Sequence, residues 1–402
     1  MLLQLAAVLV EENMAQVRNL LNLEPPSLFL EVESALRRSL GPADPAKQAD
    51  HVLRLSNHYV SSPESLSPWS HAWAMKALLS YYHPLNQSRA FGVANRGLQR
   101  GFFEGLSTIH DFGCGTGAAA LGMLAAWPEF KKVVLSDHSS EVLKTAHTLF
   151  SEVPLLSKDG VKWDTKAETL ETSSPPESPK TSLALFSYVL TEAGAIDRFE
   201  RFLKRGAQRS FEAIVILEPS TSADGRRLQR LRSVLLENDY HIWAPCTHSD
   251  KCPLLEESDR DWCHDRFPPF LPSWWKNLEA GLPMKNQSIT VSYLLARKKP
   301  LPSETKFVRV TGDPLHEKTK MRQLICRGPH REFISWFPSR FAKPAAKELK
   351  NFDLARGDLF KDDPKFWQDQ RGAERGHEYR LGENEIFQIR DSLEELAIKL
   401  SK

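Results

Sequence analysis

Apolar residues are spaced differently in successive parts of the chain. Up to residue 105 they recur at helical intervals, as in Trp73-Ala77-Leu78-Tyr81, and runs typical of strands are scarce. This spacing predicts an N-terminal helical domain over residues 1–105, which begins with an amphipathic helix at Leu2–Val10. The aromatic segment Tyr81–Asn86 is interpreted as packing this domain onto the next one, with contact to a nucleotide or RNA as the alternative.

From Thr108 onward, short apolar runs alternate with helical ones, which is typical of a parallel sheet with crossover helices. The pattern predicts an α/β Rossmann domain over residues 106–299. The predicted strands are Thr108–Phe112, Lys132–Asp137, Ser182–Tyr188, Phe211–Leu217, His241–Ala244 and Ile289–Arg297. The predicted helices are Ala118–Trp127, Ser140–Phe150, Ala195–Arg205 and Asp224–Glu237. The Ser- and Pro-rich segment Glu171–Pro179 is expected to be a surface loop.

The last two predicted strands are expected to pair as the antiparallel edge hairpin of a class I methyltransferase fold, with an insertion at 245–285 between them. After residue 299, alternation in Lys306–Thr311 and Met321–Arg327 predicts a small β element within a C-terminal part that spans 300–402. The charged end, from Asn351 on, is expected to be partly helical.

A glycine-rich turn follows the first predicted strand, in Asp111-Phe112-Gly113-Cys114-Gly115-Thr116-Gly117. Glycines between a strand and a helix let the backbone turn tightly and approach a ligand. The spacing is shorter than the Gly-x-Gly-x-x-Gly dinucleotide fingerprint, and no Lys-Ser or Lys-Thr follows as a P-loop requires. The turn therefore favours S-adenosylmethionine, with Asp111, Gly113, Gly115, Thr116 and Gly117 as predicted contacts.

Three more residues complete the predicted donor site. Asp137 ends the second strand, where an acidic side chain can accept from both ribose hydroxyls. Asp164 is expected near the adenine amino group, and Ser187 lies at the carboxyl end of a strand where methyltransferases place substrate-facing residues. The segment Phe186–Glu192 lacks the Asn- or Asp-Pro-Pro-aromatic motif of adenine amino methylases. No catalytic residue is evident, so the sequence leaves enzymatic activity undecided.

Four of the five cysteines suggest a metal site. Cys246, Cys252 and Cys263 cluster among Pro, His, Asp and Lys residues of the insertion, unlike buried cysteines that pack as small apolar groups. Cys326 can supply a fourth thiolate, whereas Cys114 belongs to the glycine turn. Four thiolates suit an iron-sulfur cluster or tetrahedral zinc, and His248 and His264 keep a Cys3His zinc site open. If Cys326 is a ligand, metal loss is expected to release the C-terminal element.

Charge is unevenly distributed along the sequence. The net charge is +2, but Arg297–Lys361 holds 16 Lys and Arg against 7 Asp and Glu, a local excess of +9. Such a C-terminal surface is expected either to attract phosphate backbones or to be a solvated surface without a partner. The sequence has no apolar run long enough for a membrane span and no secretory or transit signal, which favours a cytoplasmic protein. We expect it to be a monomer.

The chain resembles the methyltransferase-like proteins of the small ribosomal subunit, which occur in mitochondria and have bacterial relatives named as rRNA methylases. The resemblance runs from about Tyr81 to Phe360. It is carried by the glycine turn, Ser187–Glu192, the cysteine block Ala244–His264, Ile325-Cys326-Arg327 and Ala355-Arg356-Gly357-Asp358. It implies a [4Fe-4S] cluster on Cys246, Cys252, Cys263 and Cys326, binding to small-subunit rRNA, and a role in ribosome assembly or translation.

These features lead to three hypotheses. The first is an S-adenosylmethionine-binding, iron-sulfur protein that acts on or with small-subunit rRNA and docks through its basic C-terminal part. The second is an active rRNA methyltransferase. The third is a methyltransferase of another substrate that carries structural zinc.

Overall fold

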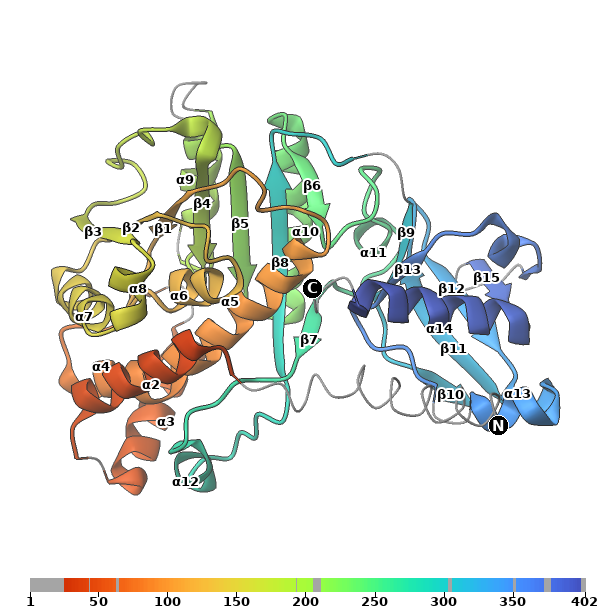
Figure 1. The fold of residues 1–402 in the computed structure, drawn as a ribbon, viewed down its shortest axis with the longest axis horizontal. Coiled ribbons are helices and arrows are strands. Elements are labelled where there is room, and N and C mark those ends of the chain that lie inside the picture. The colour runs from red at the N-terminus through yellow and green to blue at the C-terminus, as the bar shows by residue number, and fades with distance from the viewer. Residues whose placement is uncertain are drawn as a thin grey trace.

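The alternating strands and helices after Thr108 form a mixed α/β fold in the computed structural model, which describes residues 25–42, 44–62, 65–192, 194–204, 211–302, 306–349, 352–371 and 377–398 (Figure 1). The helix predicted at Leu2–Val10 lies outside these residues.

The larger sheet has eight strands in the order β3-β2-β1-β4-β5-β8-β6, with β7 paired to β8. Strands β1 to β5 run parallel, while β8 is antiparallel to β5, β6 and β7. This is the predicted arrangement with an antiparallel hairpin at one edge. The strands are β1 (Thr108–Phe112), β2 (Lys132–Asp137), β3 (Lys162–Ala167), β4 (Ser182–Ser187), β5 (Ala213–Glu218), β6 (His241–Ala244), β7 (Asp265–Phe267) and β8 (Ile289–Arg297).

Both faces of this sheet are buried, and alternate residues of each strand point to opposite cores. Leu183 and Leu185 of β4 pack into one core, and Ala184 and Phe186 into the other. Helices α2 to α7 contribute to the first core and α9 and α10 to the second. The helices are α2 (Ser27–Leu40), α3 (Pro45–Ser61), α4 (Ala72–Ala77), the π-helical turn η2 (Leu78–Tyr82), α5 (His83–Leu98), α6 (Ala118–Ala126), α7 (Ser140–Ser151), α8 (Pro154–Lys158), α9 (Ala195–Leu203), α10 (Ser222–Glu237), α11 (Pro253–Glu256) and α12 (Trp275–Ala280).

The predicted ranges of β1, β2, β6 and β8 are confirmed, and β4 ends one residue early because Tyr188 has a φ of +62°. The sequence analysis missed β3 and β7. Strand β3 is an edge strand with four polar residues among its six, so it lacks the apolar run expected of a parallel strand. Strand β7 has only three residues.

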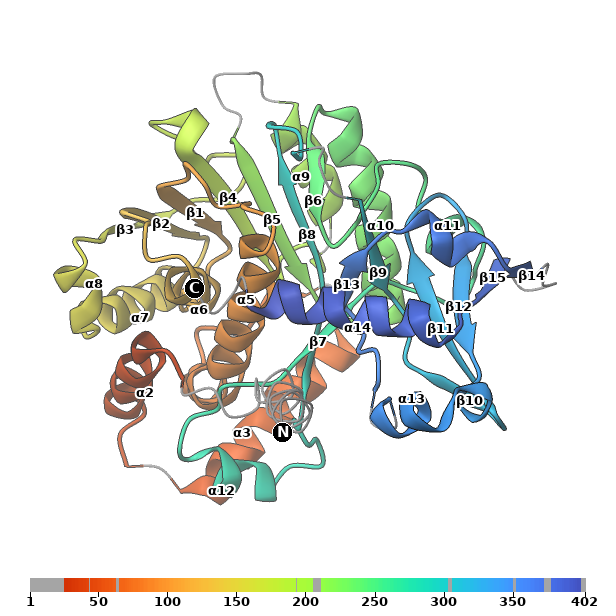
Figure 2. The ribbon, with the colours of Figure 1, turned by 45° about the vertical axis from the view of Figure 1, so that its right-hand side comes forward.

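The C-terminal part forms a seven-stranded sheet in the order β13-β9-β11-β12-β15-β14, with β10 paired to β11, beside the larger sheet (Figure 2). It is larger than the predicted small β element, because strands after residue 331 belong to it. Its elements are β9 (Phe307–Val310), β10 (Leu315–Glu317), β11 (Lys320–Cys326), β12 (Glu332–Trp336), α13 (Lys343–Glu348), β13 (Leu359–Lys361), β14 (Gln370–Arg371), β15 (His377–Arg380) and α14 (Glu383–Ile398). No described helix combines the length and apolar character that a membrane span requires.

Candidate functional site

The glycine turn connects β1 to α6 and contains three glycines with positive φ: +66° at Gly113, +53° at Gly115 and +78° at Gly117. A Cβ at Gly113 would collide with Val189, and one at Gly117 with Phe150. A Cβ at Gly115 would meet no atom within 4 Å. The outer two glycines are therefore required by packing, while the space beside Gly115 is open to a ligand.

Asp111 is the fourth residue of β1, just before this turn, and is fully buried. Both of its carboxylate oxygens lack a hydrogen-bond partner in the described part of the chain. Burial raises the pKa of Asp111 to about 8, and the nearby charge of Asp137 acts in the same direction. The structure thus places a buried carboxyl group with unused hydrogen-bonding capacity beside the predicted donor site.

Asp137 fixes the shape of the turn. One carboxylate oxygen accepts from the backbone N–H of Gly115 at 3.0 Å, and the other accepts from the N–H of Ser139 at 2.9 Å. The structure brings the predicted ribose-binding carboxylate to the glycine turn, where both oxygens already hold backbone groups. The oxygen that accepts from Gly115 keeps a further lone pair with which to accept from a hydroxyl, while the other oxygen also lies 3.3 Å from Nδ1 of His138.

Thr116 contacts a residue that the sequence analysis did not select. Its Oγ1 lies 2.7 Å from Nδ1 of His83, the first residue of α5, which directly follows the π-helical turn η2. His83 is fully buried, and burial lowers its pKa to about 3, so its imidazole is neutral. In the sequence, His83 could have been found only as part of the aromatic segment Tyr81–Asn86. Tyr81 of this segment packs by stacking on Trp275, whereas His83 contacts the glycine turn.

Asp164 is not brought to this site. It lies in the middle of edge strand β3 and is exposed. Its Oδ1 accepts a hydrogen bond from the backbone N–H of Thr165 at 2.9 Å. The carboxyl end of β3 lies three residues later at Ala167, where Glu168 accepts a hydrogen bond from Ser136 at 2.7 Å. Glu168 is therefore the acidic residue that β3 places beside Asp137, because its backbone N–H donates to the Asp137 carbonyl at 3.1 Å.

Ser187 ends β4, and the next residue, Tyr188, is held in the left-handed region at φ +62°. A non-glycine residue in this region is strained, and such strain is found most often at functional sites. The guanidinium of Arg89 lies 5.7 Å from the Tyr188 ring centroid. On the neighbouring strand, Glu218 ends β5 and accepts from the Leu190 N–H at 2.9 Å.

Because of Glu218, we expect the free energy of unfolding to depend measurably on pH. Burial raises its pKa to about 8, so the folded protein keeps this proton through a range in which the unfolded chain releases it near pH 4.5. Stability should therefore fall as the pH rises between these two values, by about 1.4 kcal/mol per pH unit from this group. Glu218→Gln, which cannot titrate, should have a shallower slope in urea unfolding over this range. Glu177→Gln, at a largely exposed carboxylate, is the control, and an equal slope in wild type and Glu218→Gln would contradict the prediction.

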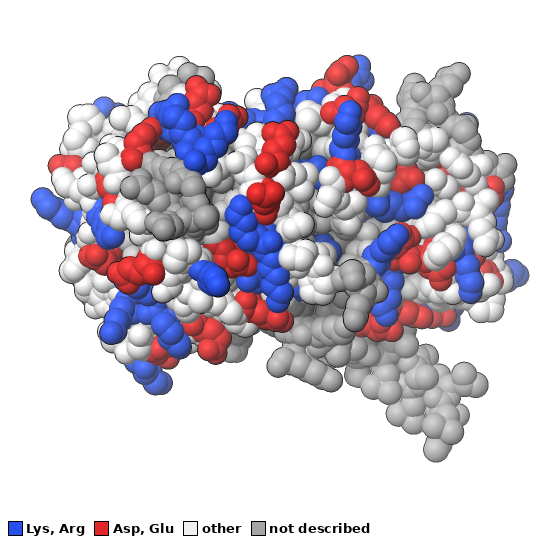
Figure 3. Space-filling model, turned by 90° about the horizontal axis from the view of Figure 1, so that it is seen from above, with Lys and Arg blue, Asp and Glu red and all other residues white. Residues whose placement is uncertain are grey.

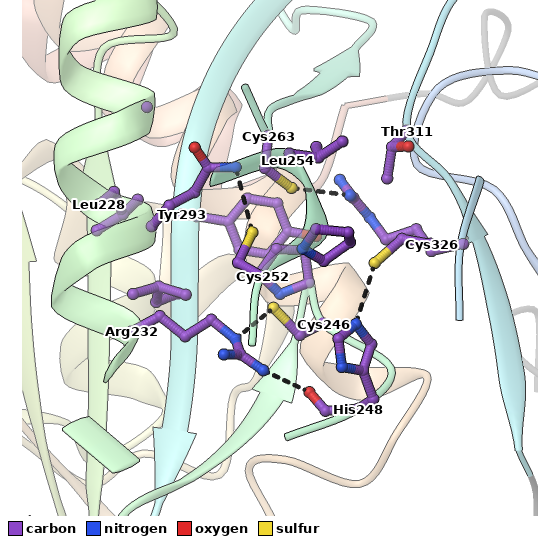
Figure 4. A pocket seen from close by; sticks show the side chains of 16 residues that line it. Leu228, Arg232, Cys246, His248, Cys252, Leu254, Cys263, Tyr293, Thr311 and Cys326 are labelled. Atoms are coloured by element: carbon purple, nitrogen blue, oxygen red, sulfur yellow. Dashed lines mark hydrogen bonds between the residues drawn. The ribbon is translucent and has the colours of Figure 1, made fainter. Parts of the chain in front are cut away.

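All four cysteines selected from the sequence line one pocket between the larger sheet and the C-terminal sheet (Figure 4). Cys246 follows β6, Cys252 precedes α11, Cys263 precedes β7, and Cys326 ends β11. The fifth, Cys114, is buried in the glycine turn, with its Sγ 3.4 Å from the Gly115 carbonyl. Residues separated by up to 80 positions thus line the same pocket.

Each of the four sulfurs is accompanied by a side-chain nitrogen. Arg232 Nε donates to Cys246 at 3.2 Å, Gln229 Nε2 to Cys252 at 3.4 Å and Arg309 Nη1 to Cys263 at 2.9 Å, while His248 Nε2 lies 3.4 Å from Cys326. Arg232 and Arg309 are both buried. Arg309 has the Asp265 carboxylate as an anionic partner, whereas Arg232 donates to Cys246 and to the His248 carbonyl and forms no ion pair with a carboxylate in the described ranges. The charge of Arg232 therefore favours a negative sulfur at Cys246.

Three of the four thiols have pKa values above the ordinary cysteine value. Burial raises the pKa values of Cys252, Cys263 and Cys326, and the charges of the neighbouring cysteines add to this effect. In the part of the chain that the structure describes, no three His, Cys, Asp or Glu side chains form a group that could hold a metal ion. The cysteines therefore share a pocket without standing in a ligand geometry. His264, predicted as a possible ligand, instead stacks on Trp262.

A buried charge network adjoins the pocket. Asp265 is fully buried, forms ion pairs with Arg309 and with Arg96 at 3.3 Å, and accepts from the Tyr293 hydroxyl at 2.8 Å. Arg309 of β9 lies directly opposite Cys326 of β11 in the antiparallel register, so the arginine and the cysteine are neighbours across the two strands. Burial alone would raise the pKa of Asp265, but Arg309 and Arg96 outweigh it and lower that pKa. The network joins α5, β7, β8 and β9.

The basic excess of residues 297–361 is largely paired. At least eight of its 16 cations form ion pairs, including Arg322 with Glu378, Arg331 with Asp261 and Lys361 with Glu395. These three acids lie outside the segment that was counted. The face seen in Figure 3 shows acidic and basic side chains interspersed. The +9 of the sequence segment therefore overstates the charge that the folded C-terminal part presents.

Residues 103–332, which are 230 of the 402, match the family described as mitochondrial small ribosomal subunit Rsm22. The chain belongs to this family. The Rsm22 match includes the glycine turn and all four pocket cysteines. A comparison with curated proteins gives no match.

Among solved structures, the chain resembles a Pyrococcus horikoshii protein named as an RNA methyltransferase, with 16% identity, a TM-score of 0.32, and coverage of 53% of this chain and 83% of the other. It also resembles a ribosomal protein L11 methylase from Lactobacillus delbrueckii subsp. bulgaricus, with 12% identity, a TM-score of 0.29 and coverage of 53% and 79%. A third is an S-adenosylmethionine-dependent methyltransferase from Aquifex aeolicus, with 14% identity, a TM-score of 0.29 and coverage of 41% and 86%.

Proposed function

We propose that this Rsm22-family protein binds S-adenosylmethionine and a four-cysteine [4Fe-4S] cluster and acts on or with small-subunit rRNA in ribosome assembly or translation. The observation that carries the proposal is the convergence of Cys246, Cys252, Cys263 and Cys326 on one pocket, each sulfur beside a side-chain nitrogen, in a chain of a small-ribosomal-subunit family. The proposal assigns no catalytic residue.

The chemistry of the pocket fits an iron-sulfur cluster. Four thiolates without a metal repel one another in a buried space, whereas a cluster or a zinc ion compensates their charge. When bound, a [4Fe-4S] cluster supplies an electron-accepting group or a structural tie between its four cysteines. Arg232 and Arg309 would donate to two of the sulfurs, and these donors favour the anionic form. Zinc on the same four cysteines is the alternative.

The glycine turn fits a methyl donor. The open space beside Gly115, the unused hydrogen-bonding capacity of Asp111 and the remaining lone pair of Asp137 would receive the amino and hydroxyl groups of S-adenosylmethionine. When bound, this cofactor supplies an electrophilic methyl group. The chain's own contribution is to hold the turn rigid through Asp137 and through the Thr116–His83 contact.

Gly115→Ala tests the donor site. Both Gly115 and Gly160 have positive φ, and neither would bring a Cβ within 4 Å of another atom, so alanine at either position should cost about 1–2 kcal/mol of unfolding free energy. Only the Gly115 methyl group enters the proposed ligand space. Isothermal titration with S-adenosylmethionine should therefore show at least a roughly tenfold affinity loss for Gly115→Ala. Equal affinities of the two variants would refute the site.

Metal and sulfide analysis, coupled to ribosome co-sedimentation, tests the proposal as a whole. Protein purified without oxygen should be brown, contain iron and acid-labile sulfide, and co-sediment with small subunits. Stoichiometric zinc without sulfide would reject the cluster while leaving a thiolate metal site. Pull-down without ribosomal components would reject the ribosomal role.

A further inference from the structure

Helices α3 and α4 present a basic face with aromatic side chains. On α3, Lys47, His51 and Arg54 follow helical spacing along one side, while Gln48, Ala49, Val52 and Leu55 are buried on the other. On α4 and its N-cap, His71, Trp73 and Lys76 lie against this side. We call these six residues the α3–α4 basic face: Lys47, His51, Arg54, His71, Trp73 and Lys76.

The cations of this face are available for a partner. Lys47, Arg54 and Lys76 are exposed, and none of them forms an ion pair within the described ranges. Burial and the charges of Lys76 and Lys47 lower the pKa of His51, against the smaller opposite effect of Asp50, which shows how closely the cations gather. In the C-terminal part, by contrast, at least eight of the 16 cations of residues 297–361 pair with a carboxylate.

The aromatic side chains form a stack. The Arg54 guanidinium lies 4.0 Å from the Trp73 ring centroid, and the His71 ring lies 5.9 Å from the same ring with an interplanar angle of 18°. His71 is exposed and Trp73 is half-buried. Aromatic rings and guanidinium planes are the surfaces on which unpaired nucleobases stack, and cations beside them contact the phosphates.

We propose that the α3–α4 basic face binds single-stranded RNA of the small ribosomal subunit, with Lys47, Arg54 and Lys76 at the phosphates and the His71–Trp73 stack against a base. This rests on the proposed function, which assigns small-subunit rRNA as the partner, and adds to it the surface that binds the RNA. It stands on the charge and ring geometry of α3 and α4 together with the family match. It is independent of the cysteine pocket. In Figure 1 these helices lie at the opposite end of the molecule from the C-terminal sheet.

The test uses the full-length protein and a labelled single-stranded 12-residue oligouridine, with fluorescence anisotropy as the readout. The variant Lys47→Gln/Arg54→Gln/Lys76→Gln should bind at least tenfold more weakly, and the slope of log affinity against log salt should become shallower by about 2, since each lost phosphate contact removes about 0.7. His71→Ala should weaken binding about tenfold with the salt slope unchanged.

The matched control is Arg340→Gln/Lys343→Gln/Lys347→Gln, which removes three exposed charges from the C-terminal part near α13. It should bind nearly as wild type. Equal losses in both triple variants, or no loss in the α3–α4 variant, would overturn the proposal. If the α3–α4 variant loses binding to intact small subunits but not to oligouridine, the partner is a ribosomal protein and the RNA assignment is wrong. Unchanged melting temperature and metal content separate each result from failure of the cysteine site.

Discussion

Asp265→Asn is expected to lower the free energy of unfolding by about 3–5 kcal/mol. The substitution keeps the size of the side chain but removes the buried carboxylate that forms ion pairs with both Arg309 and Arg96. Arg309 is only 2% exposed, so its charge would remain buried without its counterion. Urea unfolding of the full-length protein measures the loss, because it compares the same chain with and without this charge.

A surface carboxylate provides the control for this result. Glu177→Gln removes the partner of Lys132 at a largely exposed carboxylate and should leave stability nearly unchanged. If Asp265→Asn is as mild as Glu177→Gln, the buried network contributes little to holding the two sheets together. The double variant Asp265→Asn/Arg309→Met should recover part of the loss, since it removes the unpaired charge along with its partner.

Cys326→Ser should abolish stoichiometric metal and sulfide in protein purified without oxygen. A hydroxyl is a poor ligand for iron or zinc sites built from thiolates, and three cysteines remain on the other side of the pocket. Cys114→Ser is the matched control, because Cys114 is equally buried but lies in the glycine turn and should leave the metal content unchanged. Metal loss in both variants would mean that the assay follows general instability.

The same variant tests the prediction from the sequence that metal loss releases the C-terminal element. Contacts other than the cysteines also cross between the two parts. Arg309 pairs with Asp265, Arg331 with Asp261, and Leu254 packs against Leu324 and Phe333. Cys326→Ser should therefore keep the radius of gyration of the wild type in small-angle X-ray scattering, whereas Asp265→Asn should weaken the docking of the two sheets.

The sequence was informative where the physical signal is local. Apolar runs with β-branched residues predicted β2 and β8 with their observed bounds, and the glycine turn identified the end of β1. Cys246, Cys252 and Cys263 were selected because their neighbours are polar, and Cys326 as a possible fourth thiolate; all four line one pocket. Their metal remains a prediction.

Other features depend on contacts between distant residues. Charge counting along Arg297–Lys361 missed the acids that face these cations, such as Glu378 and Asp265. Asp164 was selected by its place after an apolar stretch, but β3 continues past it. His83 has no motif, and only the fold brings it to Thr116. The basic residues of α3 and α4 do not form a run in the sequence. They come to lie on one face only because of the helical periodicity.

The pairing of Cys326 with Arg309 has a consequence for how the protein is made. Because side chains alternate between the two faces of a sheet, a one-residue slip of β11 against β9 would turn Cys326 away from the pocket. The fourth cysteine also comes 63 positions after the third, so a ribosome must translate through β11 before the pocket can close. The four cysteines can therefore come together only after β9 and β11 have been synthesised and have paired in the observed register.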